Sequence, residues 1–143
     1  MTELCEVVIT APDPDWLLDL TRQLVAERLC ASVHNFGPVR SVYRWQDEIF
    51  ERVEGRASLH TRTALVQQIV DRVKAVHPYE VPGISARPIT DGNPEYLRRL
   101  ETLGASRWDH QTERGASAAG ATSVGLRPEA IKMGDRIEPP PIP

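Results

Sequence analysis

Two hydrophobic periodicities alternate along residues 1–103, and this alternation constrains the fold more than any other feature of the sequence. Extended runs repeat their apolar residues at every second position, whereas helical runs repeat them at every third or fourth position. In chain order the predicted elements are extended over residues 6–10, helical over 16–28, extended over 33–45 and 49–59, helical over 65–76 and extended over 84–90. The order β-α-β-β-α-β predicts a ferredoxin-like α+β fold, in which right-handed crossovers put both main helices on one face of a four-stranded sheet.

Pairs of residues that contain proline mark where several elements begin or bend. Asp13 followed by Pro14 is typical of an N-cap residue and a first helical position. Asn93 and Pro94 repeat this pattern and predict a short C-terminal helix. Gly37-Pro38 lies inside the first long extended run and predicts a bend or bulge there.

Threonine and proline residues set the limits of the later elements. Thr61 or Thr63 is predicted to cap the helix of residues 65–76, and Pro78 is predicted to end it. Pro88 cannot donate a backbone hydrogen bond, so it places the last strand at the edge of the sheet or makes that strand irregular.

The last part of the chain differs in composition from the first 103 residues. Residues 104–143 contain five glycines, five prolines and six alanines, and Trp108 is their only aromatic residue. Such a segment buries too little apolar surface to offset the entropy of ordering it. We therefore expect one domain over residues 1–103 and a flexible tail over residues 104–143, with docking of residues 124–137 as the alternative.

Charge and hydropathy exclude several classes of protein. The net charge is −3 with no cluster of Lys and Arg, so neither nucleic-acid binding nor attachment to an anionic membrane is expected. No stretch approaches the ~20 apolar residues that a membrane helix requires. The sequence carries no export signal, so Cys5 and Cys30 predict reduced thiols in a cytoplasmic protein.

Five segments, in order and at family spacing, resemble the CutA divalent-cation-tolerance family over about residues 5–103. They are residues 10–13 (Thr-Ala-Pro-Asp), 24–33 (which begin Leu-Val-Ala-Glu-Arg-Leu), 41–45 (Ser-Val-Tyr-Arg-Trp), 77–82 (His-Pro-Tyr-Glu-Val-Pro) and 88–97. The resemblance implies a homotrimer in which the long hairpin of residues 39–56 reaches a neighbouring subunit. It also implies kinship in shape with the PII signal-transduction proteins, and a part in tolerance of copper or another divalent cation.

The family resemblance also implies where copper would bind. Members with a proposed copper site have a cysteine in the first strand and a pair of histidines before Pro-Tyr. This chain has Ile9 and Val76 at two of those three positions, and only His77 remains. One imidazole per chain is short of the several nitrogen or sulfur ligands that copper requires, although three copies of His77 could converge in a trimer. The alternative is that His77 caps the C-terminus of its helix.

Aromatic and acidic residues supply the other candidate site. Tyr43, Trp45 and Tyr79 either line a stacking cleft for a small ligand or anchor a subunit interface, where such side chains are enriched. Glu54 and Glu80 either accept hydrogen bonds from an arginine of a neighbouring subunit or form a proton-transfer pair at an inter-subunit cleft. If the protein is an enzyme, Glu54, Tyr79 and Glu80 are the catalytic candidates.

The sequence contains no Gly-rich phosphate loop, no GxSxG and no Cys/His pair at catalytic spacing. We therefore expect a CutA-like trimer that acts in metal tolerance or small-ligand sensing without catalysis. One alternative is an enzyme that uses an inter-subunit cleft, suggested by Asp47-Glu48 where the family usually has Gly-Lys. A second alternative is an interaction module that recruits a partner through the proline-rich residues 139–143.

Overall fold

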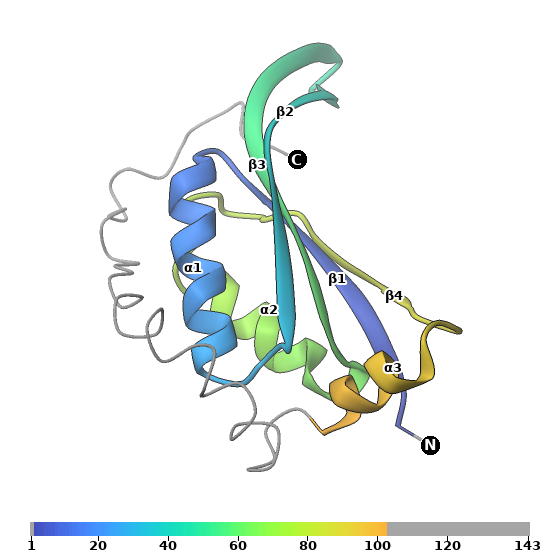
Figure 1. Ribbon diagram of the computed structural model, residues 1–143. Coiled ribbons are helices and arrows are strands. Elements are labelled where there is room, and N and C mark those ends of the chain that lie inside the picture. Colours follow the sequence, from blue (N-terminus) through green and yellow to red (C-terminus); the bar gives the residue numbers. More distant parts are fainter. Residues whose placement is uncertain (1, 103–143) are drawn as a thin grey trace.

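The computed structural model describes residues 2–102, so the predictions for the tail lie outside the described residues. The secondary structure confirms the α+β fold and the order β-α-β-β-α-β with a terminal helix (Figure 1). The elements are β1 (Leu4–Ala11), α1 (Pro14–Ala26), β2 (Ser32–Trp45), β3 (Glu48–Arg62), a short 3-10 turn (Thr63–Leu65), α2 (Val66–Lys74), β4 (Ile84–Pro88) and α3 (Pro94–Glu101). Within residues 2–102 no helix is long and apolar enough to cross a membrane.

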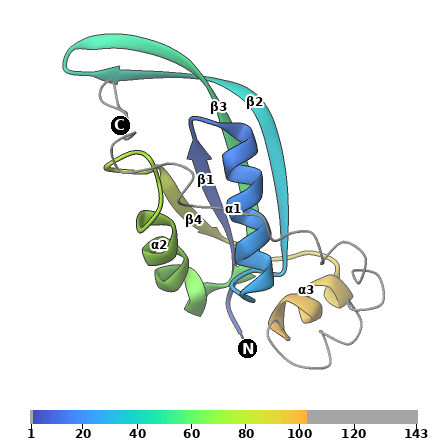
Figure 2. The same ribbon diagram turned by 90° about the vertical axis from the view of Figure 1, so that its left-hand side faces the viewer.

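The four strands form one antiparallel sheet in the order β2-β3-β1-β4. Helices α1 and α2 lie together on one face of this sheet (Figures 1 and 2). β4 is an edge strand, as Pro88 predicts, because a proline there costs no hydrogen bond to a further strand.

The core lies between the sheet and these two helices. Alternate side chains of β1 and β3 point into it, and the apolar stripes of α1 and α2 cover them. The side chains with no exposed surface in this layer are Val7, Ile9, Ala11, Leu17, Leu20, Leu24, Ala57, Leu59, Ile69 and Val73. Burial of these side chains supplies the hydrophobic free energy that holds the helices on the sheet.

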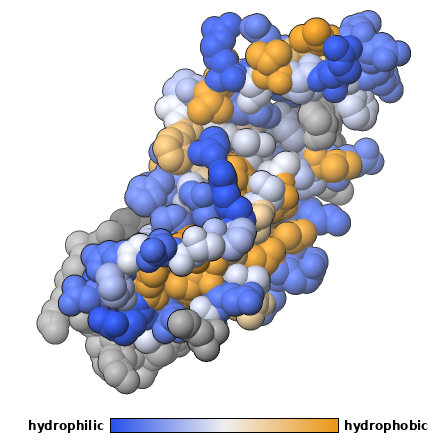
Figure 3. Space-filling model, turned by 90° about the vertical axis from the view of Figure 1, so that its right-hand side faces the viewer, coloured by the Kyte–Doolittle hydropathy of each residue, from blue (hydrophilic) through white to orange (hydrophobic). Residues whose placement is uncertain are grey.

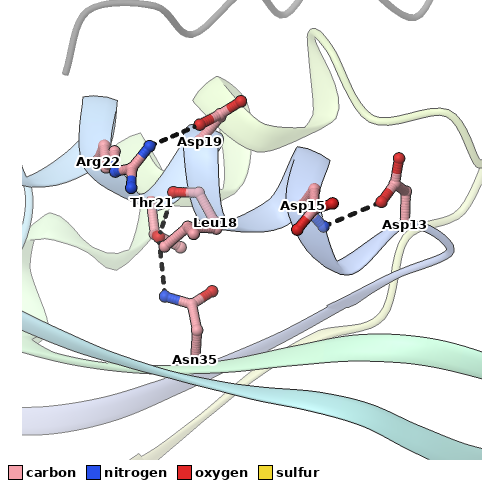
Figure 4. Close-up of polar contacts among 7 residues, drawn as sticks. All are labelled: Asp13, Asp15, Leu18, Asp19, Thr21, Arg22 and Asn35. Carbon is pink, nitrogen blue, oxygen red and sulfur yellow. Dashed lines mark hydrogen bonds and ion pairs between the residues drawn. The ribbon is translucent and has the colours of Figure 1, made fainter. Parts of the chain in front are cut away.

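The start of α1 agrees with the sequence pattern, and its middle is tied to the sheet. Asp13 is the N-cap residue, and its Oδ1 accepts a hydrogen bond of 2.9 Å from the backbone N–H of Asp15 (Figure 4). The middle of the helix is tied to β2, because Asn35 Nδ2 donates to Thr21 Oγ1 over 3.1 Å. The helix ends at Ala26, slightly before the predicted end, and Arg28 follows with φ of 62° in the left-handed region.

The prediction that a threonine caps α2 is wrong. β3 runs to Arg62, so Thr61 is a buried strand residue whose Oγ1 donates to the carbonyl of Leu29 over 2.6 Å. Thr63 begins the short 3-10 turn, and in the described structure no side chain caps α2 at Leu65. The strand ladder and the 3-10 turn replace the expected cap.

The hairpin of β2 and β3 extends well beyond the body of the molecule (Figures 1 and 2). Its register shifts between Phe36 and Val39, which confirms the bulge predicted at Gly37-Pro38. Gln46 and Asp47, with φ of 50° and 67°, form the two-residue turn that suits the twist of the strands.

The second face of the sheet is only partly covered. α3 lies over one end of it, where Leu4 is 6% exposed and Leu100 is fully buried outside the main core. Asn93 caps this helix as predicted, since its Oδ1 accepts from the backbone N–H of Glu95 over 3.1 Å. Seen from the side opposite α1, apolar side chains reach the surface on both the body and the hairpin (Figure 3).

Candidate functional site

The predicted residues Glu54, His77 and Tyr79 come together where the hairpin leaves the body. Glu54 lies on β3, and the other two lie in the loop between α2 and β4. All three side chains are buried, with exposed fractions between 1% and 6%. Buried polar groups of this kind must satisfy one another, because water cannot reach them.

Glu54 is held by hydrogen bonds to both of its carboxylate oxygens. The Tyr79 hydroxyl donates to Oε2 over 2.8 Å, and the Ser41 hydroxyl donates to Oε1 over 2.7 Å. These two charge-assisted hydrogen bonds offset the free-energy cost of burying the carboxylate. The contact joins both strands of the hairpin to the loop that follows α2.

Tyr79 is kept in its protonated form. Burial raises the pKa of the phenol well above its ordinary value, and the hydrogen bond to Glu54 and the carboxylate charge raise it further. The guanidinium of Arg52 lies over the Tyr79 ring, 5.4 Å from its centroid, and opposes this shift. The hydroxyl is therefore a fixed donor to the carboxylate rather than a group that ionises near neutral pH.

His77 connects the same loop to the end of β1. Its Nε2 lies 2.8 Å from the carbonyl oxygen of Thr10, and its Nδ1 accepts from the backbone N–H of Tyr79 over 3.0 Å. Because a carbonyl oxygen only accepts, Nε2 carries the ring proton and Nδ1 is the acceptor. The backbone N–H of His77 bonds to the last turn of α2 through the carbonyl of Val73, but the ring itself bonds to β1 and not to helix carbonyls.

The residues around His77 do not fit a resident copper ion. Both ring nitrogens are engaged in hydrogen bonds, so a metal would have to displace one of them. Ile9 and Val76 supply no donor atoms. Within residues 2–102 no three His, Cys, Asp or Glu side chains are placed to hold a metal ion. The described residues around His77 therefore do not form a metal site.

The remaining predicted residues lie at different distances from this cluster. Tyr43 stacks on Phe50 across the hairpin, with 5.7 Å between ring centroids, and it contributes slightly to the raised pKa of Tyr79. Trp45 lies at the last position of β2, next to the turn of the hairpin. Glu80 is exposed, so it does not join the buried Glu54–Tyr79 pair.

Two residues of the cluster were missed by sequence reasoning, namely Ser41 and Arg52. They face each other across the hairpin, and their side chains share one face with Tyr43 and Glu54. Strand alternation puts Ser41 on the same face as Tyr43, so it could have identified both residues if the register of the hairpin had been known.

A second polar cluster lies on the other face of the sheet, beneath α3. His60 Nδ1 and the Tyr96 hydroxyl are 2.6 Å apart, and the same hydroxyl is 3.0 Å from Ser32 Oγ. No local sequence pattern predicts this contact, because Tyr96 is 36 residues away from His60 in the chain. This contact fixes α3 on the sheet.

Glu6 completes the second cluster. The hydroxyl of Ser58 donates to its carboxylate, and this bond is the main cause of a lowered pKa of Glu6. The positive charge of Arg87, 3.4 Å away, lowers this pKa further, as does His60, whose Nε2 lies 3.9 Å from the carboxylate. The carboxylate is thus held in its charged form at the partly open surface of the sheet.

The CutA1 divalent ion tolerance protein family matches residues 5–102 of the chain. The chain belongs to the CutA1 family. The family match covers both polar clusters and every element of the described structure.

Several relatives of the family show how far the similarity reaches. Divalent-cation tolerance protein CutA of Thermus thermophilus is 43% identical over 91 residues, which cover 64% of this chain and 88% of that protein. Protein CutA of Homo sapiens is 34% identical over 104 residues, which cover 73% of this chain and 58% of that protein. The chain spans between 58% and 63% of the length of the vertebrate relatives that it matches.

Solved structures of the CutA1 family agree with the fold. CutA1 of Oryza sativa superposes with a TM-score of 0.69 at 30% identity, covering 71% of this chain and 94% of that chain. The Thermus thermophilus protein gives a TM-score of 0.65 at 42% identity, covering 70% and 95% respectively.

Proposed function

We propose that this member of the CutA1 family is a cytoplasmic homotrimer that acts in divalent-cation tolerance by sensing a small ligand, without a catalytic step. The observation that carries the proposal is the buried contact between Glu54 and Tyr79, which ties the projecting hairpin to the loop after α2. A ligand that contacts this loop would alter the position of the hairpin, because the loop and the hairpin share one hydrogen-bond network.

The homotrimer is supported by the apolar surface of the hairpin. Val42, Ile49 and Val53 are 63%, 65% and 52% exposed in the single chain, on one face of two paired strands. Apolar side chains grouped in this way favour contact with another protein surface. In the proposed assembly they lie against a neighbouring subunit, and Tyr43 and Trp45 anchor the opposite face of the hairpin.

Native mass spectrometry of the protein purified from its own cells tests the proposal as a whole. It reports the number of subunits, any bound metal ion and any retained small molecule in one measurement. A three-chain complex that retains a small molecule is the expected result. A monomer without any ligand, at the concentration found in the cell, would contradict it.

The hypothesis that His77 binds copper needs a separate test. The hydrogen bonds of both ring nitrogens speak against it, so we expect equilibrium dialysis with Cu²⁺ to give the same stoichiometry for the wild type and for His77→Ala. A lower stoichiometry in the variant would make His77 a ligand. Because the ring is buried, His77→Ala must first be shown to retain the wild-type subunit number.

An enzyme that uses the same residues is the second candidate, favoured by the 2.8 Å hydrogen bond between a buried phenol and a buried carboxylate. Such a pair could exchange a proton with a substrate bound between subunits. Glu54→Gln and Tyr79→Phe would then abolish turnover, whereas Glu51→Gln, at an exposed position of β3, is the matched control. Equal turnover in all three variants would remove the enzyme hypothesis.

A further inference from the structure

The segment between β4 and α3 contains a peptide bond with unusual chemistry, remote from the Glu54–Tyr79 cluster. Asp91 is followed by Gly92, and it is the only Asp or Asn in the 143 residues that precedes a glycine. Both residues are exposed. The last sheet contact before them is the hydrogen bond from the N–H of Ile89 to the carbonyl of Leu4.

The geometry of this pair brings a nucleophile and an electrophile together. The backbone N–H of Gly92 donates to Oδ1 of Asp91 over 2.9 Å, so the amide nitrogen faces the carboxyl group of the preceding side chain. The same hydrogen bond holds the nitrogen close to the carboxyl group whose carbon it would attack. Glycine has no Cβ to shield this approach.

We propose that Asp91–Gly92 is a site of spontaneous isomerisation to isoaspartate in the folded protein. The Gly92 nitrogen attacks Cγ of the protonated Asp91 carboxyl group, a new N–Cγ bond forms and one carboxyl oxygen leaves as water. The product is a five-membered cyclic imide. Water then adds to the main-chain carbonyl carbon of residue 91 and breaks its bond to nitrogen. The chain afterwards runs through Cγ, and the former main-chain carbon becomes a free carboxylate.

The site lies where one additional backbone carbon matters for the fold. Asn93, the N-cap residue of α3, follows immediately, and its side chain accepts from the N–H of Glu95. Tyr96 follows three positions later and holds α3 on the sheet through His60. Isomerisation therefore displaces the start of α3 relative to the sheet and loosens this contact.

The experiment incubates the full-length protein at neutral pH and physiological temperature in water enriched in heavy oxygen, with sampling over weeks. Hydrolysis of the imide introduces one heavy oxygen atom at residue 91, and peptide mapping with electron-transfer fragmentation distinguishes isoaspartate from aspartate. Two variants accompany the wild type. Asp91→Glu keeps the charge but disfavours the five-membered ring. Gly92→Ala adds a methyl group whose nearest neighbours are atoms of the Leu97 side chain, at 3.6 Å and beyond.

We expect heavy oxygen to accumulate at residue 91 faster than at Asp15 or Asp71, which precede bulky residues. The label should be absent in Asp91→Glu and several-fold slower in Gly92→Ala. We also expect the native protein to react at least as fast as the same chain unfolded in urea, because the folded loop aims the amide at the carboxyl group. A native rate below the unfolded rate would show that the loop protects the bond, and would overturn the proposal.

Discussion

At the scale of single residues, the Glu54 carboxylate shows how a buried charge is kept in this fold. It is only 6% exposed, yet both oxygens accept hydrogen bonds from hydroxyl groups. Leaving one of these donors without its charged partner costs more than the bond itself contributes, because a desolvated polar group remains. The hydroxyls of Ser41 and Tyr79 therefore depend on the carboxylate as much as it depends on them.

Glu54→Gln should lower the free energy of unfolding by about 2 kcal/mol, since an amide NH₂ replaces one acceptor oxygen next to a hydroxyl. Denaturant unfolding at one fixed protein concentration measures the change, because an oligomer's stability depends on concentration. Glu51→Gln is the matched control on the same strand, where the ion pair with Arg40 is largely exposed. We expect that control to change stability by less than about 0.5 kcal/mol. An equal loss in both variants would contradict the role given to Glu54.

Tyr79 should make the protein less stable in alkali. Its pKa is raised in the folded state, so its stabilising contribution is complete below the pKa of about 10 of an unfolded tyrosine. As the pH rises above that value, the unfolded chain loses the phenolic proton first, and the contribution is lost. Tyr79→Phe removes this part of the pH dependence.

The measurement is the free energy of unfolding at pH values between about 8 and 11, for the wild type and Tyr79→Phe. The difference between the two should be constant at the lower end and should shrink toward the upper end. Two curves that stay parallel throughout would mean that Tyr79 ionises equally readily in both states.

At the scale of elements, α3 depends on few contacts. It has only eight residues, a length at which an isolated helix is marginal in water. Its docking rests on the buried Leu100, on the Asn93 cap and on the Tyr96 hydroxyl shared by His60 and Ser32. The helix therefore relies on these docking contacts to stay folded.

Tyr96→Phe keeps the ring and removes the hydroxyl, so we expect the free energy of unfolding to fall by about 1 kcal/mol. Hydrogen exchange followed by mass spectrometry should show faster exchange of the α3 amides, while the amides of β1 serve as the internal control. Unchanged exchange in α3 would mean that the hydroxyl contributes nothing to docking.

The close approach of α1 to the hairpin limits which residue can stand at position 55. A Cβ added at Gly55 would lie 2.6 Å from the backbone Cα of Pro14, closer than two such atoms can stand. We expect Gly55→Ala to lower the free energy of unfolding by about 1–3 kcal/mol, measured by thermal or denaturant unfolding. Gly37→Ala is the matched control, because its nearest contact would be the Pro14 side chain at 3.4 Å. Equal stability of the two variants would contradict this close packing.

At the scale of the whole molecule, the hairpin is the feature that a single chain leaves incomplete. One face of the hairpin carries Val42, Ile49 and Val53, which are exposed in the single chain. Exposed apolar side chains that lie close together favour contact with a second protein surface.

The double variant Ile49→Lys, Val53→Lys should therefore dissociate the proposed trimer while each chain keeps its fold. Light scattering should give three times the chain mass of 16.0 kDa for the wild type and a single chain for the variant. Val25→Lys, at a position 41% exposed on α1, is the control and should leave the mass unchanged. A wild-type protein of one chain would contradict the trimer itself.

Local sequence patterns were enough to predict the order of the elements and most of their limits. The alternation of apolar residues is local, and so are the caps at Asp13 and Asn93, because each acts on a backbone N–H two residues away. Local chemistry of this kind can be read without knowing the fold. The bulge at Gly37-Pro38 and the edge position of Pro88 were predictable for the same reason.

Which polar side chains meet depends on the three-dimensional fold. Glu54 and Tyr79 are 25 residues apart, and His60 and Tyr96 are 36 apart, so no local pattern joins them. Thr61 is a case in which a local pattern gave the wrong prediction. Its strand pairing with β1 outweighs the local tendency of a threonine to cap a helix. The sequence named Glu54 and Tyr79 as candidates, but their bond exists because the sheet register and the loop after α2 bring two distant segments together.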